Sequence, residues 1–102
     1  MLANNSVANN KNKIKVNNEK AAGMYGENGS LVTNTSTGEI EITADGKNAM
    51  GIYVTGENTA AGKVTEGVND GIININGKEG TGMLATAKGK VTNNKEINGS
   101  SL

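Results

Sequence analysis

One short pattern recurs three times along this chain, and a fourth copy begins near residue 96. Its first half alternates isoleucine or valine with polar residues, and its second half is glycine followed by methionine or isoleucine. A repeat with a period of about 25 to 33 residues is typical of a solenoid, in which each unit buries its apolar side only against its neighbours. The copies of the first half are Lys13–Val16, Glu39–Ile42, Ile72–Ile75 and Glu96–Asn98, and those of the second half are Gly23–Tyr25, Gly51–Tyr53 and Gly82–Leu84.

Each repeat contains three short segments with the alternation of β-strands, separated by clusters of glycine and asparagine that favour corners. The third segment is the weakest, at Leu31–Thr33, Val64-Thr65 and Val91-Thr92. The chain has no proline, which suits ladders in which every backbone N–H donates a hydrogen bond. We therefore expect an all-β fold, a parallel β-helix of three to four coils with three short strands each. The expected core columns are Ile14, Ile40, Ile73 and Ile97, and Met24, Ile52 and Met83 with Val54 and Ala85 on the same side.

The repeats also set the expected boundaries. Residues 1–12 are polar and rich in asparagine, and we expect them to be a frayed segment before a β-helix that spans 13–102. The middle repeat is longer than the others, with its extra residues in 55–62. Because insertions in a solenoid leave at corners, this loop is expected to project outward.

Composition argues against several classes of function. Ten lysines balance ten acidic residues and arginine is absent, so nucleic-acid binding is not expected. No apolar run is long enough to span a bilayer, so direct membrane insertion of these residues is not expected either. The N-terminus lacks the features of a signal peptide, so we expect either a chain that stays inside the cell or an excerpt from a longer secreted protein. The incomplete fourth repeat favours the excerpt.

Two surface features are candidate partner-binding sites. Tyr25, Tyr53 and Leu84 should form an outward column, where exposed aromatic rings can stack on sugars or pack against a protein. Such a column can also serve simply as side-chain stacking along a sheet. The second candidate is the long loop, represented by Glu57, Asn58 and Thr59.

Aligned first strands place charges of opposite sign next to each other. Lys13 should stack on Glu39 and Lys15 on Glu41, all on the outward side, which predicts two ion pairs between coils. Exposed pairs contribute only about 0–1 kcal/mol each, so their expected role is to fix the register of the stack.

Enzymatic chemistry is not expected. Polysaccharide-cleaving β-helices use clustered carboxylates, often with arginine or histidine, and this chain has neither basic residue. The glycine-rich segment 77–82 lacks the Lys-Ser/Thr that follows a phosphate loop, and the spacing of a calcium-binding roll is also missing. We expect no catalytic residues, no cofactor and no metal site.

The repeats resemble a known family. Gly-Met-Tyr and Gly-Ile-Tyr each lead into Gly-Glu-Asn, and the chain also contains Asn-Thr-Ser-Thr-Gly-Glu-Ile-Glu-Ile and Asn-Asp-Gly-Ile-Ile-Asn-Ile-Asn-Gly. Over residues 13–98 these motifs resemble the passenger repeats of large type V autotransporter adhesins, virulence factors of which the fusobacterial group is the most similar. The resemblance implies a right-handed β-helix stalk on the bacterial surface, attached through an outer-membrane barrel outside this sequence. It also implies that partners are proteins or glycans of host cells or other bacteria, together with neighbouring coils of the same rod.

Two other functions stay open from the sequence. One is a polysaccharide-binding β-helix of the kind found in phage tailspikes. The other is a self-assembling filament subunit, because both ends of a short β-helix expose unpaired ladder edges.

Overall fold

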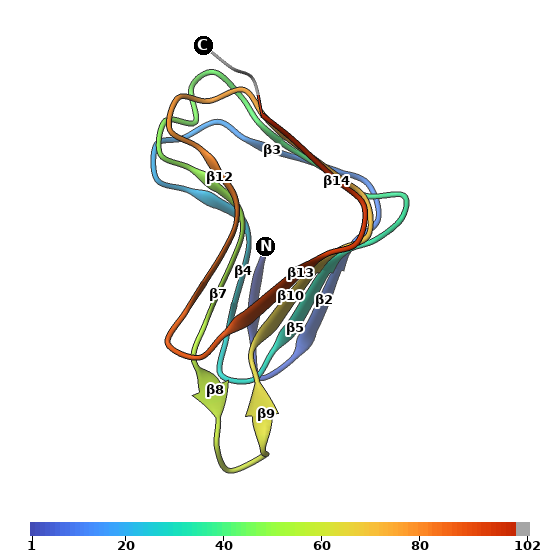
Figure 1. Cartoon of the computed structure of the whole chain (residues 1–102), viewed down its shortest axis with the longest axis vertical. Helices are drawn as coiled ribbons and strands as arrows, with labels where there is room; N and C mark the ends of the chain where they lie inside the picture. The colour runs from blue at the N-terminus through green and yellow to red at the C-terminus, as the bar shows by residue number, and fades with distance from the viewer. Residues whose placement is uncertain (100–102) are drawn as a thin grey trace.

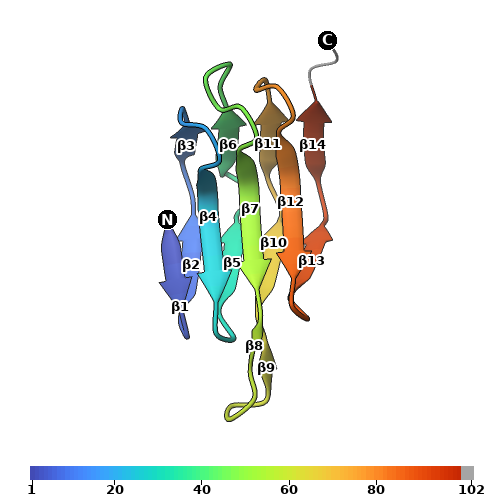
Figure 2. The ribbon, with the colours of Figure 1, turned by 90° about the vertical axis from the view of Figure 1, so that its left-hand side faces the viewer.

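The computed structural model describes residues 1–99, which form a parallel β-helix of four coils (Figures 1 and 2). Each coil contributes one strand to each of three parallel sheets, here called A, B and C, which confirms the predicted all-β architecture. Sheet A contains β1 (Leu2–Asn4), β4 (Ala22–Glu27), β7 (Met50–Thr55) and β12 (Thr81–Thr86). Sheet B contains β2 (Val7–Asn10), β5 (Leu31–Asn34), β10 (Glu66–Asn69) and β13 (Lys90–Asn93). Sheet C contains β3 (Lys13–Val16), β6 (Glu39–Ile42), β11 (Ile72–Ile75) and β14 (Glu96–Gly99).

The molecule is wider than it is tall. Its extents are 43 × 24 × 18 Å, and the coils lie over one another in the view down the shortest axis (Figure 1). The coils therefore stack along the shortest dimension, in agreement with four layers about 4.8 Å apart. The two end faces of the stack are consequently its broadest surfaces.

The core consists of the columns that the alternation predicts. Ile40 and Ile73 stack in register in sheet C, and Met24 and Ile52 stack in sheet A, all with no exposed surface. Because the coils are parallel and in register, every repeat places its apolar residues on those of the next. Met83 and Ile97 continue these columns in the last coil but are only partly buried, because that coil has a neighbour on one side only among the described residues.

Sheet A bends toward the interior of the coil (Figure 1), and glycine begins the second half of each repeat because its backbone closely approaches neighbouring atoms. A Cβ atom on Gly51 would lie 2.6 Å from the carbonyl oxygen of Gly82 in the next coil and 3.0 Å from Cγ2 of Ile73. Gly23 is similarly confined, with the carbonyl oxygen of Gly51 at 2.9 Å from the position of its Cβ. Only a residue without a side chain allows the coils to approach this closely.

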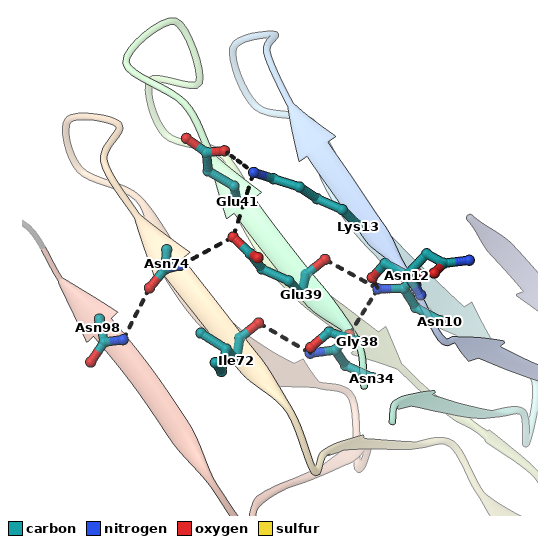
Figure 3. Close-up of polar contacts among 10 residues, drawn as sticks. All are labelled: Asn10, Asn12, Lys13, Asn34, Gly38, Glu39, Glu41, Ile72, Asn74 and Asn98. Carbon is teal, nitrogen blue, oxygen red and sulfur yellow. Dashed lines mark hydrogen bonds and ion pairs between the residues drawn. The ribbon is translucent and has the colours of Figure 1, made fainter. Parts of the chain in front are cut away.

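A ladder of asparagines joins the four coils at the corner between sheets B and C. The Nδ2 atom of Asn10 donates to Oδ1 of Asn34, Asn34 donates in the same way to Asn69, and Asn69 to Asn93, each over 2.8 Å. Each of the three donors also bonds backbone carbonyls at the corner; Asn34, for example, reaches those of Gly38 and Ile72 (Figure 3). These buried amides are fully paired, so the ladder satisfies the polar backbone of the corner and fixes the stacking register.

The N-terminal segment differs from the expectation. Residues 1–12 were expected to precede the β-helix, yet Leu2–Asn4 and Val7–Asn10 form the first two strands of coil 1 and pair with β4 and β5. Small or polar side chains face the interior in these two strands, with Ala3 only 2% exposed and Asn10 buried as the first rung of the ladder, while the larger core residues of coil 1, Ile14 and Val16, lie in β3. Two strands without large inward apolar residues give no strong hydrophobic signal in the sequence.

The sheet B strand of coil 3 also differs from the expectation, which placed the third segment of the middle repeat at Val64-Thr65. The strand is β10, and its register puts Gly67 opposite Val32, while Val64 belongs to the inserted loop. Sixteen residues therefore separate Gly51 from Gly67, compared with nine between Gly23 and Val32. The strand was predicted at Val64-Thr65 because both residues are β-branched. It forms instead at the residues that pair in register with β5 of the neighbouring coil. Residues 100–102, at the end of the expected β-helix range, lie outside the described residues.

Candidate functional site

The insertion in coil 3 forms an antiparallel hairpin of β8 (Glu57–Asn58) and β9 (Lys63–Val64), which lies outside the coil (Figures 1 and 2). It leaves the corner between sheets A and B, so the loop predicted at 55–62 does project outward. Gly56 and Gly62 have φ angles of +80° and +67°, which glycine adopts without strain and which turn the chain out and back. The tip, which includes Thr59, is exposed to solvent.

The hairpin contacts the corners of the other three coils. The Nδ2 atom of Asn58 donates to Oδ1 of Asn5 in coil 1 over 3.3 Å, and Glu57 forms an exposed ion pair of 3.9 Å with Lys88 in coil 4. The hairpin also crosses Gly29, where an added Cβ would lie 2.7 Å from Cβ of Asn58. These contacts hold the base of the hairpin against the rod although only coil 3 carries the insertion.

A groove lies between the hairpin and the outer face of sheet B. Its volume is about 620 Å³, within the range of about 300–1,000 Å³ that is common for ligand sites. Three of the five large apolar side chains that are most exposed among the described residues line it: Val7 at 65%, Leu31 at 38% and Val64 at 48%. The complete lining is Asn5, Ser6, Val7, Gly29, Ser30, Leu31, Lys63, Val64, Glu66 and Lys90.

The groove combines an apolar floor with a charged rim. Val7 and Leu31 are register partners in adjacent strands, and the same outward column continues into Glu66 and Lys90. Lys63 adds a second ammonium group from the hairpin. This arrangement suits a partner that presents an apolar group beside polar or acidic groups, because the floor can be dehydrated while the rim stays solvated.

The tyrosine column forms as the alternation predicts, on the outer face of sheet A. Tyr25 and Tyr53 are register partners with ring centroids 5.3 Å apart and a tilt of 55°, and Leu84 follows in coil 4. The Tyr25 hydroxyl donates to Oε1 of Glu27 over 2.9 Å, and this hydrogen bond raises the pKa of Tyr25. The rings thus stack along the sheet, and at least one of the phenols is already paired within the rod.

The charged columns of sheet C form in the predicted register but with a different pairing. Lys13 lies opposite Glu39 and Lys15 opposite Glu41, yet the Lys13 ammonium contacts both carboxylates, Glu41 at 3.1 Å and Glu39 at 3.7 Å (Figure 3). Among the described residues Lys15 forms no ion pair. The long lysine stem reaches the diagonal neighbour on the next strand, which alternation alone does not reveal.

These contacts shift the ionisation of both groups. The hydrogen bond to Glu41, followed by the nearby charges, raises the pKa of Lys13. The same hydrogen bond lowers the pKa of Glu41. Asn74 extends the polar row by donating to Oε2 of Glu39 over 3.3 Å, and Asn98 donates to Asn74 over 3.0 Å (Figure 3). The row therefore links all four coils on the outer face of sheet C.

The predicted partner-binding residues thus lie on two separate parts of the surface. Tyr25, Tyr53 and Leu84 lie on sheet A, whereas Glu57, Asn58 and Thr59 lie on the hairpin. Their role in binding stays a prediction. The groove was missed because its floor includes Val7, which was placed outside the β-helix. Aligning the segments Val-Ala-Asn-Asn and Leu-Val-Thr-Asn would have revealed that Val7 and Leu31 are neighbours, but not the groove itself, which also requires the hairpin.

Within residues 1–99, no three side chains of histidine, cysteine, aspartate or glutamate gather in a way that could hold a metal ion. The same residues contain no helix with the length and apolar character needed to cross a membrane. The chain has no significant match among protein-family models, curated proteins or solved structures. Its function has to be inferred from its own residues and geometry.

Proposed function

We propose that this chain is a stalk segment of a bacterial surface adhesin of the autotransporter kind, which holds binding regions away from the cell. The whole protein would be secreted and attached through an outer-membrane barrel that lies outside this sequence. The observation that supports the proposal most is the unbroken register of all three sheets over four coils. A stack of this kind can be lengthened coil by coil without changing the cross-section, which suits a spacer.

The way in which the insertion is accommodated supports the same proposal. The extra residues of coil 3 form the hairpin, while β7 and β10 keep their register with both neighbouring coils. A stalk of this type can carry recognition elements at its corners without losing its core. The hairpin and the adjoining groove are the elements that we propose for contact with a surface protein or glycan.

Surface display is tested in the whole protein, produced by its own or a related bacterial host. An epitope tag is inserted between Ala60 and Ala61 at the exposed hairpin tip, and intact cells are labelled with antibody. The proposal predicts labelling without permeabilisation and loss of labelling after brief protease treatment of the cells. Labelling that requires permeabilisation would contradict display on the cell surface. A cytoplasmic marker protein is the control for cell integrity.

Binding is tested separately with the purified chain on a glycan array and on epithelial cell monolayers. The double variant Val7→Ser and Leu31→Ser removes the apolar floor of the groove, and Tyr25→Ser with Tyr53→Ser removes the aromatic column. Both pairs lie on the surface, so far-UV circular dichroism should remain unchanged. Reduced binding by the groove variant alone would identify the groove as the contact. Equal binding by both variants and the original chain would contradict a role for either.

A further inference from the structure

The groove between the hairpin and sheet B has the features of a site for an extended peptide. We propose that it binds a protein segment that adds as a third strand to the outer edge of β9, with an aliphatic side chain on the groove floor and an acidic side chain beside the lysines of the rim. This inference rests on the groove as a contact site of the proposed function, and it names the chemistry of the partner.

The strand β9 has an open edge that faces the groove. Within residues 1–99 it pairs with β8 alone, and it lies on the sheet B side of the hairpin (Figure 1). The N–H of Thr65 donates to the carbonyl of Gly56 over 3.2 Å, so the alternation of an antiparallel ladder directs the N–H and C=O groups of Val64 to that open edge. An extended peptide can be added to such an edge through main-chain hydrogen bonds.

The floor of the groove favours an aliphatic side chain. Val7, Leu31 and Val64 line it and are 65%, 38% and 48% exposed. Covering these side chains would remove apolar surface from water, which favours association. Among the described residues that line the groove none is aromatic, so the floor offers no ring on which a sugar could stack. A peptide therefore fits this floor better than a glycan does.

The rim of the groove favours an acidic group beside that side chain. Lys63 and Lys90 contribute two ammonium groups and Glu66 contributes one carboxylate, so positive charge is in excess. Within residues 1–99 none of the three forms an ion pair, although Glu66 and Lys90 are register partners. In an extended strand, residues two positions apart project to the same side. One segment can therefore present an aliphatic and an acidic side chain to the groove together.

The site is formed before a partner binds. Asn58 donates to Asn5 over 3.3 Å and Glu57 pairs with Lys88 over 3.9 Å, and these contacts hold the hairpin and with it the edge of β9. Because the edge is already in place, binding incurs less of the entropic cost of ordering the site. The groove lies on the side of the coil stack, so further coils beyond either end face would leave it open.

Binding is measured by fluorescence anisotropy with the purified chain and labelled peptides of about eight residues, a length that covers a typical strand. The peptides vary two positions that are two residues apart, with isoleucine or serine at the first and glutamate, glutamine or lysine at the second. We expect the peptide with isoleucine and glutamate to bind most tightly, and replacing its glutamate by lysine should raise Kd by about three- to tenfold. The double variant Val7→Ser and Leu31→Ser should raise Kd for the same peptide by about tenfold or more, because the apolar contact is lost.

The charged rim is tested by removing one lysine at a time. Lys63→Gln and Lys90→Gln should each raise Kd for the glutamate peptide by about two- to fivefold and leave Kd for the glutamine peptide nearly unchanged. Lys15→Gln is the matched control, since Lys15 is also exposed and forms no ion pair within residues 1–99 but lies on sheet C. It should leave both values of Kd unchanged. Far-UV circular dichroism checks that every variant keeps its fold.

Strand addition is tested with two further peptides that are N-methylated on opposite sets of alternate residues. Only one set of N–H groups can face β9, so one peptide should lose binding and the other should keep it. Equal Kd values for these two peptides, undiminished binding by the groove double variant, or no binding of any peptide at up to about 1 mM would overturn the inference. Groove-dependent binding of a glycan in place of the peptides would also overturn it but would leave the proposed function standing. Surface labelling of intact cells does not depend on these peptides, so a failure of the stalk proposal is detected separately.

Discussion

Replacing Asn34 by alanine removes a middle rung of the asparagine ladder. This side chain has no exposed surface, donates to Asn69, Gly38 and Ile72, and accepts from Asn10. The shorter side chain leaves two backbone carbonyls and two side-chain amides, those of Asn10 and Asn69, with fewer partners inside the protein. Water cannot replace these contacts without opening the corner, so the loss acts directly on the folded state.

The expected magnitude follows from the four hydrogen bonds. Each contributes about 0.5–1.5 kcal/mol net, and part of the loss is offset because Asn69 still accepts from the backbone N–H of Gly71. We therefore expect Asn34→Ala to lower the free energy of unfolding by about 2–4 kcal/mol. Asn93→Ala is the matched control, because this last rung is exposed and accepts one short hydrogen bond; its expected cost is about 0.5–1 kcal/mol.

Urea unfolding of the three proteins, followed by far-UV circular dichroism, measures both differences at equal protein concentration. Unchanged slopes with shifted midpoints would show that the variants lose stability rather than cooperativity. Equal losses for the two variants would refute the reasoning, because they would mean that the buried rung contributes no more than an exposed asparagine.

Three further predictions concern the bend and the charged columns. Gly51→Ala should destabilise the chain by about 1–3 kcal/mol in urea unfolding, because its Cβ would lie 2.6 Å from a carbonyl oxygen, whereas Gly99→Ala should change stability by less than about 0.5 kcal/mol. A similar effect of both would contradict the close approach at the bend. Changing Glu39 and Glu41 together to lysine should cost more stability than changing both to glutamine, since Lys13 would then face like charges; equal melting temperatures would contradict the stacking register. Lys13 lowers the pKa of Glu41, so their ion pair stabilises the folded state fully at a pH above the unfolded-state pKa of Glu41, about 4.3. This stabilisation is lost as the pH falls through the lower folded-state pKa of Glu41. The difference in urea midpoint between the original chain and Glu41→Gln should therefore shrink from about pH 7 to about pH 3, and a constant difference would contradict the coupling.

The coil architecture could be predicted because each repeat signals its inward residues by alternation. Ile40 and Ile52 lie where a period of two places them, and their register partners follow from the alignment of the repeats. The sequence showed that glycine recurs at the position of Gly51 in each repeat, but it did not show why glycine is required there. The close approach to the next coil that requires it depends on the bend in sheet A, which is a property of the stack.

The asparagine ladder and the groove could not be recognised in the same way. Asparagine is common at turns, so Asn34 and Asn69 look like ordinary corner residues until their strands are aligned. The groove depends on the direction of the hairpin, which is determined by its packing over Gly29 in another coil. Contacts of this kind join parts of the chain far apart in sequence and leave no local pattern.

The most direct test of the stalk proposal is to read the coding sequence on both sides of this segment in its source genome. The proposal predicts further coils on either side, each with a glycine at the bend of sheet A and an asparagine at the position equivalent to Asn34, and with segments for secretion and outer-membrane attachment beyond them. Flanking sequence without these residues at coil spacing, or a reading frame confined to these 102 residues, would contradict it.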